Sequence, residues 1–264
     1  MFEHTSGTPT MLEITIILSL VSFLAGLIDS IAGGGGLLLV PSLLLAGLPP
    51  QTALGTNKFA ATMGTGTALL NFIRGRKVIW KIAVYGIAFA LLGGFSGSKA
   101  ILSFDNNVVG KVIVFLLPLA AISVLYPKKS IVSEKSHFSR LDLFLKIPLI
   151  CFPIGFYDGF FGPGTGSFFI LTFYLFLGIG LVHASGTAKV FNFLSNLGAL
   201  VIFLYEKKVI YLLGVPLALA NIAGNYVGSH LVIKKGEKIV RAFLLISLSV
   251  LFVSLVWKYF LKSP

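Results

Sequence analysis

Two aspartates lie inside long apolar stretches, and their chemistry is the first thing this chain must explain. Asp29 is in G-L-I-D-S-I-A-G-G-G-G-L-L-L-V-P, and Asp158 is in G-F-Y-D-G-F-F-G-P-G-T-G-S-F-F-I-L. A charged side chain at the centre of a bilayer costs ~2.5–3.5 kcal/mol on insertion scales, and intramembrane carboxylates recur in proton relays. We therefore predict that Asp29, Asp158 or both couple function to protons. Another possibility is that each aspartate pairs with a lysine when the site is empty. The alternative is that each one caps a helix break at the glycines that follow it.

A glycine cluster follows each aspartate, at Gly33–Gly36 in the first stretch and at 162–166 in the second. Each cluster opens another apolar segment, and free backbone N–H groups at the start of a helix form an anion site. We expect Gly34, Gly35 and Gly164 to contact a bound anion. The alternative is close packing of helices through small residues.

Two lysines follow the same short motif, Gly-Thr-x-Lys, at Lys58 and Lys189. Thr56 and Thr187 are predicted to cap helices that begin there, which places each ammonium at the unfavourable end of the helix dipole. A negative partner is therefore expected, either a carboxylate or a bound anion. We predict that an anion contacts both lysines and both threonines, together with Asn57. The alternative is that the lysines reach the lipid headgroups.

Asn192 and Asn196 lie four residues apart, with Ser195 beside them. That spacing places both amides on one face of a helix. Asn192 completes the set of side chains that we expect at the anion. Hydrogen bonds between helices explain these residues equally well. The matching positions in the first half of the chain carry other side chains: Ala61, Gly64 and Thr65.

The composition indicates where these residues work. Of the 264 residues, 56% are hydrophobic and 11% are charged, whereas a soluble domain carries roughly 25% charged residues. The chain is predicted to be an all-α, multi-span membrane protein in contact with the lipid bilayer. The N-terminus lacks the basic stretch of a signal peptide, so we expect the first span to be retained.

The net charge of +12 does not indicate a nucleic-acid partner, because the basic residues gather in short loops as in membrane proteins. These loops contain Arg74, Arg76, Lys77 and Lys81; Lys128, Lys129, Lys135 and Arg140; and Lys234, Lys235, Lys238 and Arg241. The single cysteine, Cys151, has no Cys/His cluster around it, so no metal is expected.

The apolar segments fall into two halves, with a tail at 1–11 and a polar loop at 126–141. The first half covers 12–125 and the second covers 142–260. The predicted segments are 12–31, 37–48, 54–73, 78–101 and 109–125, then 142–161, 167–182, 187–204, 209–233 and 239–260. The halves align as two homologous repeats, because the Asp, Gly-Thr-x-Lys, Lys-Val-Ile and Gly-Ser motifs recur in the same order.

The orientation of the repeats depends on the segment at 37–48, which is too short for a ~30 Å hydrocarbon core at 1.5 Å per residue. If it crosses, each half has five crossings and the repeats are inverted. If it turns back, each half has four and they are parallel. We favour the inverted arrangement, because Glu3 and Glu13 have no basic neighbours and suggest an outside N-terminus. Both arrangements place the two termini on the same side.

The aspartate-glycine stretch followed by Gly-Thr-x-Lys, repeated once, resembles the sulfite exporter TauE/SafE family of membrane transporters. The resemblance covers about residues 12–260. It implies a plasma-membrane permease for small sulfur-containing anions such as sulfite, sulfonates or sulfoacetate, with no cofactor. It fixes neither the substrate nor the direction of transport. The second repeat departs from the first at Pro163, Thr165 and Ala188, so the two half-sites are not expected to be equivalent.

Three functions remain open at this point. The favoured one is a secondary transporter, and a passive anion channel is an alternative. An intramembrane aspartyl protease also uses two carboxylates in the membrane. It needs a Gly-x-Gly-Asp arrangement, however, whereas Ile28 and Tyr157 precede the aspartates here. We therefore expect no enzymatic activity. The sequence leaves the coupling ion and the oligomeric state open.

Overall fold

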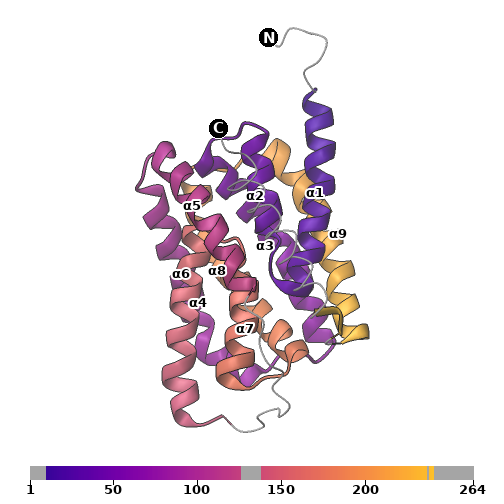
Figure 1. Ribbon diagram of the computed structural model, residues 1–264, viewed down its shortest axis with the longest axis vertical. Helices are drawn as coiled ribbons and strands as arrows, with labels where there is room; N and C mark the ends of the chain where they lie inside the picture. The colour runs from indigo at the N-terminus through magenta and orange to yellow at the C-terminus, as the bar shows by residue number, and fades with distance from the viewer. Residues whose placement is uncertain (1–9, 126–137, 237, 241–264) are drawn as a thin grey trace.

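The computed structural model describes residues 10–125, 138–236 and 238–240, and its described secondary structure is entirely helical (Figure 1). The helices of the first half are α1 (Met11–Ala32), α2 (Gly36–Leu45), α3 (Pro50–Arg74), α4 (Trp80–Leu102) and α5 (Asn106–Leu125). Those of the second half are the π-helix η1 (Asp142–Lys146) with α6 (Ile147–Phe160), α7 (Thr165–Leu177), α8 (Leu181–Tyr205) and α9 (Tyr211–Lys235). These bounds confirm the predicted all-α fold. The tail, most of the polar loop and nearly all of the segment at 239–260 lie outside the described residues, as do the two termini.

Five of the described helices are long and apolar enough to cross a membrane: α1, α4, η1 with α6, α8 and α9. Their outer faces carry large exposed apolar side chains, such as Leu20, Leu92 and Leu219. Polar side chains such as Lys58 and Lys189 are buried inside instead. A chain that is apolar outside and polar inside is suited to a lipid environment.

Two helices begin earlier than predicted. α3 begins at Pro50, where the fixed φ of proline suits the first helical turn and its missing N–H is not needed. α8 begins at Leu181. Thr56 and Thr187 therefore lie within helices, and the prediction that they are N-caps is wrong.

The two glycine clusters end one helix and start the next at the same place in the molecule. α1 stops at Gly33, which has a left-handed φ of 80°, and α7 starts after Gly164, which has a φ of 85°. The Ser167 N–H donates to the Gly33 carbonyl at 3.3 Å, and a Cβ on Gly33 would lie 2.2 Å from the backbone of Gly166. Only glycine fits so close a contact, so close packing through small residues is confirmed here.

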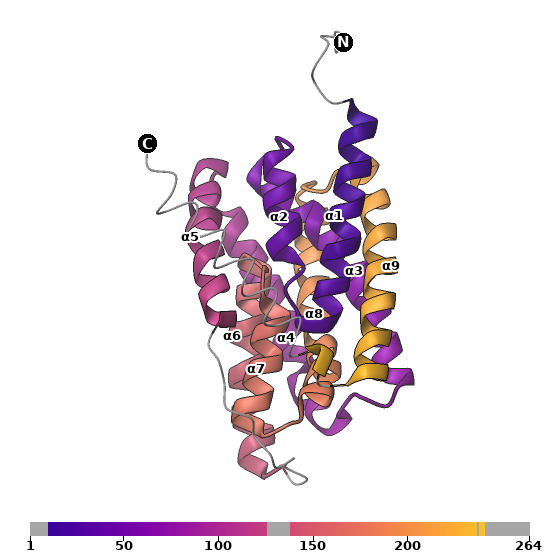
Figure 2. The ribbon, with the colours of Figure 1, turned by 45° about the vertical axis from the view of Figure 1, so that its right-hand side comes forward.

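α1 and α2 form a hairpin that starts and ends on one face of the molecule. At 1.5 Å per residue, the ten residues of α2 span about 15 Å, half of a bilayer core. α2 starts beside Pro163 at the central break, and near its end Leu44 shares a surface groove with Pro50 and Asn106. In Figures 1 and 2, α6 and α7 make the corresponding hairpin from the opposite face.

The halves therefore run in opposite directions although the short helix turns back. In Figure 1, α1 runs downward from the upper face of the molecule, whereas η1 and α6 run upward from the lower face. The described part of each half has the predicted order of segments, and α1 and α2 together make one hairpin. The number of crossings in each half stays a prediction, because most of the segment at 239–260 lies outside the described residues. The opposite directions are those of an inverted pair, and common ancestry of the halves stays a prediction.

The halves are interlocked by helices that pack on the partner half. α1 packs along α9, and α4 packs along α6. A Cβ on Gly224 of α9 would lie 2.0 Å from the Phe23 carbonyl oxygen, and one on Gly97 of α4 would lie 2.0 Å from the Phe156 carbonyl oxygen. The small residues thus let the backbones touch, as is common between membrane helices.

Loop contacts recur in matched pairs at the positions that the repeat predicts. The Ile79 N–H, before α4, donates to the Thr187 hydroxyl at 3.0 Å, and the Ile210 N–H, before α9, donates to the Thr56 hydroxyl at 3.2 Å. The adjoining loops each hold a non-glycine residue at a φ of 54°, Arg76 in one and Lys207 in the other. Each loop is thereby docked on the opposite half.

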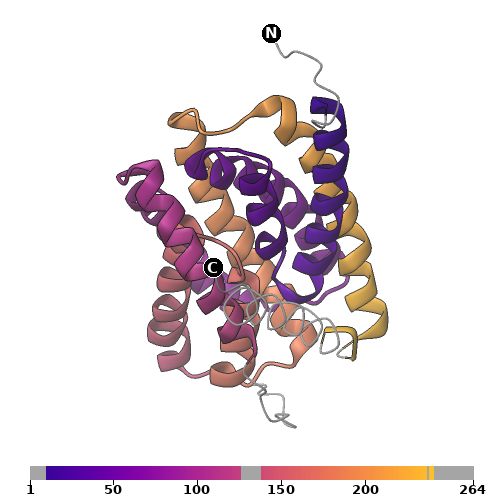
Figure 3. The ribbon, with the colours of Figure 1, turned by 45° about the horizontal axis from the view of Figure 1, so that its top comes forward.

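Basic residues gather on the face opposite the start of α1. The loop between α3 and α4, the start of η1 and the end of α9 all lie on that face (Figures 1 and 2). The loop between α8 and α9 lies on the face where α1 begins, as Figure 3 shows with that face turned forward. This is the distribution of loops expected for the inverted arrangement.

Candidate functional site

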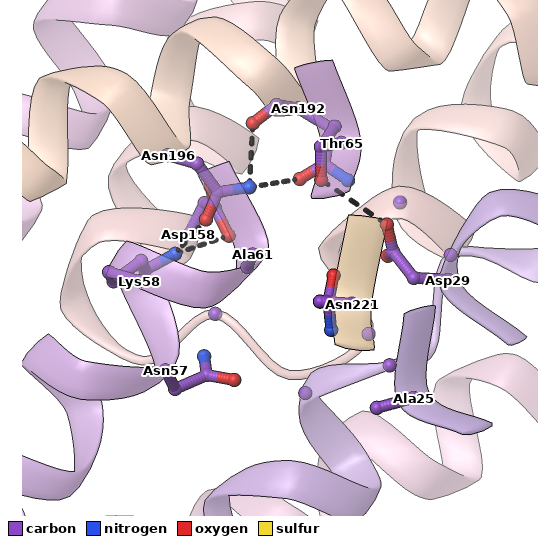
Figure 4. A pocket seen from close by; sticks show the side chains of 16 residues that line it. Ala25, Asp29, Asn57, Lys58, Ala61, Thr65, Asp158, Asn192, Asn196 and Asn221 are labelled. Atoms are coloured by element: carbon purple, nitrogen blue, oxygen red, sulfur yellow. Dashed lines mark hydrogen bonds and ion pairs between the residues drawn. The ribbon is translucent and has the colours of Figure 1, made fainter. Parts of the chain in front are cut away.

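A cavity of about 30 Å³ lies where the two helix breaks meet (Figure 4). It has room for one or two water molecules. Its walls come from both halves: Ala25, Asp29, Gly33, Gly35, Gly36, Asn57, Lys58, Ala61, Thr65, Asp158, Gly162, Gly164, Gly166, Asn192, Asn196 and Asn221. The structure thus brings together most of the residues predicted from the sequence.

Lys58 of α3 forms an ion pair with Asp158 of α6, in the other half. The Lys58 Nζ lies 2.8 Å from Asp158 Oδ1 and donates a second hydrogen bond to Asn196 Oδ1 at 2.9 Å. The Ser195 hydroxyl donates to Asp158 Oδ2 at 2.6 Å. Both charged side chains are only 2% exposed. Each carboxylate oxygen therefore has a donor, and the charge is matched in a site without bulk water.

Lys189 of α8 forms the corresponding pair with Asp29 of α1. The Lys189 Nζ lies 2.8 Å from Asp29 Oδ2 and 2.6 Å from the Asp29 carbonyl oxygen. The Thr65 hydroxyl donates to the same Oδ2 at 3.3 Å. The Asp29 side chain is 15% exposed, whereas Lys189 is 1% exposed. This pair is more open on its acidic side.

These contacts decide between the alternatives for the charged residues. The lysines lie well inside α3 and α8, so the wrong end of a helix dipole is not the reason that they need a partner. They are buried, so they do not reach lipid headgroups. Asp29 and Asp158 accept hydrogen bonds from side chains, and none of their hydrogen bonds in the described part of the chain comes from a helix-start N–H. The carboxylate partner expected from the sequence is present for both lysines.

Some predicted residues do not face the cavity. Thr56 and Thr187 hold the loops before α9 and α4, and Gly34 and Lys189 are absent from the cavity wall. Lys189 lies behind Asp29, to which its ammonium is bound.

Asn57 differs from the other polar residues of the cavity. It is 4% exposed, and its amide makes no hydrogen bond to any residue in the described ranges. Figure 4 shows the Asn57 amide next to the open space of the cavity. The repeat places Ala188 at the equivalent position, so the free amide exists in one half only. A buried amide without a partner costs free energy unless a ligand or water contacts it.

Two polar residues of the site were missed in the sequence. Asn221 of α9 lines the cavity and donates to the Ser22 carbonyl at 3.0 Å, and Asn225 donates to Asn221 Oδ1 at 2.8 Å. The available signal was their spacing of four residues inside an apolar segment, the same as that of Asn192 and Asn196.

The helix starts add to the electrostatics of the cavity. α2 and α7 both begin at its wall, where Gly35, Gly36, Gly164 and Gly166 expose backbone. A helix N-terminus carries a partial positive charge, so two of them facing one cavity favour an anion. In the described residues, no group of three or more His, Cys, Asp or Glu side chains is arranged to hold a metal ion.

Comparison with known proteins gives the site its context. A family model described as sulfite exporter TauE/SafE matches residues 18–255. The chain belongs to this family. A probable membrane transporter protein of Haemophilus influenzae is 37% identical over 235 residues, which cover 89% of this chain and 91% of the relative. The probable membrane transporter protein YfcA of Escherichia coli is 36% identical over 242 residues, covering 91% and 89%. No solved structure matches the chain.

As a TauE/SafE member, the chain is a multi-pass membrane transporter. The residues of the cavity and both ion pairs all fall inside the matched region. The family thereby confirms the resemblance read from the sequence, and the relatives' names refer to transporters, not to enzymes.

Proposed function

We propose that this TauE/SafE transporter is a secondary permease of the plasma membrane for a small sulfur-containing anion such as sulfite or a sulfonate. One observation carries the proposal: a small cavity is bordered by Lys58, by Asp29 with Lys189 paired behind it, and by two helix N-termini, one from each half. By the positive-inside rule, the basic face at the α3–α4 loop is cytoplasmic.

The binding residues of this proposal are those with a free or releasable donor at the cavity. Lys58 and the unpartnered amide of Asn57 meet the anion from α3, and Asn192 meets it from α8. Backbone N–H groups at Gly35 and Gly164 complete the set. Lys189 acts through Asp29, behind which it lies. Thr56, Thr187 and Gly34 have structural roles in this scheme.

Both lysines are neutralised in the empty site, which explains how the cavity remains stable without an anion. An entering anion brings a negative charge that the two carboxylates oppose. Protonation of the Asp29 or Asp158 carboxylate removes this opposition, and it couples the movement of the anion to that of protons. A channel has no need of such a step.

Transport into proteoliposomes tests the proposal. With an inward proton gradient, sulfite or methanesulfonate should accumulate above its equilibrium level, which a channel cannot achieve. Lys58→Met should reduce uptake more than tenfold, because a charge at 4 Å is worth ~4 kcal/mol at an effective dielectric constant of 20. Lys81→Met, at an exposed position at the start of α4, is the matched control and should transport normally. Equal uptake by both variants would contradict the proposed role of Lys58.

A further inference from the structure

The two carboxylates of the site differ in how many of their oxygens are occupied. Asp158 has a donor on each oxygen, the Lys58 ammonium on Oδ1 and the Ser195 hydroxyl on Oδ2. Asp29 receives both of its side-chain donors, Lys189 and Thr65, on Oδ2. Within the described residues, no donor reaches Asp29 Oδ1. A proton on Asp29 can therefore bind an oxygen that accepts no other hydrogen bond, whereas a proton on either oxygen of Asp158 would weaken a hydrogen bond that this oxygen already accepts.

The surroundings of Asp29 contain few other groups that can change charge. Lys189 faces it from α8, and Lys58 lies across the cavity on α3. α2, α7 and α9 contribute no titratable side chain to the cavity wall, where they present glycines and Asn221. Asp158, the remaining ionisable group, is held by its own pair.

The charges of the site add to zero when it is empty: two lysines against two aspartates. A singly charged anion in this cavity leaves one negative charge unmatched, and unmatched buried charge is strongly unfavourable. One proton on Asp29 restores neutrality.

We propose that Asp29 alone exchanges one proton as a singly charged anion enters the cavity, while Asp158 stays ionised. The inference rests on the proposed function. The proton comes from the aqueous phase and binds to Asp29 Oδ1. The neutral Asp29 no longer balances the charge of Lys189, and the negative charge of the anion balances it instead. With a doubly charged anion of the same shape, one negative charge remains unbalanced after Asp29 has taken its proton.

Methanesulfonate and sulfate form a matched pair of probes, because both are tetrahedral with five heavy atoms, and they carry one and two charges. Calorimetry in buffers of different ionisation enthalpy counts the protons taken up on binding. The protein should take up one proton when it binds methanesulfonate. In the range where Asp29 of the free protein is ionised, the affinity should therefore fall about tenfold for each unit by which the pH rises. Sulfate should bind at least tenfold more weakly.

Variants identify which carboxylate takes the proton. Asp29→Asn should bind methanesulfonate with no proton uptake and a flat pH profile. Thr65→Val should displace the pH profile, because it removes a donor to Asp29, whereas Ser195→Ala, which removes the equivalent donor to Asp158, should leave it in place. This hydroxyl pair and the wild-type proton count decide the question even if the Asp29 variant does not fold.

The outcomes separate the two proposals. Binding of methanesulfonate with an uptake of zero or two protons overturns this inference and leaves the transporter proposal standing. A pH profile that persists in Asp29→Asn, or that moves with Ser195→Ala instead of Thr65→Val, overturns it as well. If neither methanesulfonate nor sulfite binds the wild-type protein at any pH, the proposed function fails and this inference fails with it.

Discussion

The two ion pairs repeat one motif and both border the cavity, but one is almost completely buried whereas the other is more open on its acidic side. Lys58 and Asp158 are equally buried, and Asn196 and Ser195 complete their hydrogen bonds. Asp29 leaves 15% of its side chain and one of its oxygens open. A motif that recurs in both halves thus need not give the same chemistry twice, because the side chains around each pair decide what it can do.

The difference originates at one position on each central helix. α8 carries Ser195, which donates to Asp158, whereas α3 has Gly64 at the matching position. A Cβ on Gly64 would lie 2.0 Å from Asn221 Oδ1, so Asn221 occupies the space that a serine side chain would need. Near Asp29 the polar group therefore comes from α9 of the second half, and the second side-chain donor to Asp29 is Thr65, which contacts the same oxygen as Lys189.

The largest expected effect comes from breaking the more deeply buried pair, Lys58 with Asp158. Lys58→Met leaves the Asp158 charge buried, and loss of one partner of a buried pair costs ~3–5 kcal/mol. Lys189→Met should cost less, about 1–3 kcal/mol, because Asp29 keeps the Thr65 hydroxyl and an open side. Thermal unfolding in detergent measures both.

The double variant Lys58→Met/Asp158→Leu is the control for this comparison. Removal of both charges should recover much of the lost stability, as apolar replacements of buried pairs do. If Lys189→Met proves as destabilising as Lys58→Met, the contrast between the pairs is wrong.

An intermediate effect is expected at the backbone contact between Gly33 and Gly166, where the two helix breaks meet. Gly33→Ala places a Cβ 2.2 Å from the Gly166 backbone and should destabilise the protein by ~1–3 kcal/mol beyond backbone strain. Gly47→Ala is the matched control, since Gly47 also has a left-handed φ, of 87°, but has no atom within 4 Å of an added Cβ. Equal melting temperatures for the two variants would show that the breaks do not need this contact.

The smallest effect should be the same in both halves. Thr56→Val and Thr187→Val each remove one hydrogen bond to a loop N–H, at Ile210 and Ile79, worth ~0.5–1.5 kcal/mol. Their unfolding midpoints should fall by similar amounts, in contrast to those of the lysine variants. Transport and its pH profile should persist in both. A specific loss of anion binding in either variant would return that threonine to the site.

The sequence predicted the segments and the partners but not their geometry. Apolar runs located the helices. A negative partner for each lysine was expected from the helix dipole, and the carboxylates are present although both lysines lie well inside their helices. The choice of Asp158 for Lys58 depends on how α4 packs on α6 and α3 on α8, which no local pattern reveals. The threonines were misread because the run after Pro50 is polar enough to resemble a loop. Asn221 was missed although it is four residues from Asn225, because amides in an apolar helix do not reveal which neighbouring helix they face.

Each ion pair joins one half of the chain to the other, so neither pair can form until the second half has been synthesised. The first half enters the membrane with Asp29 and Lys58, and their partners, Lys189 and Asp158, are synthesised 160 and 100 residues later. Until then each charge bears the cost of a bilayer interior without its final counterion. A truncated first half should therefore be a substrate for membrane quality control, and co-expression of the second half should rescue it.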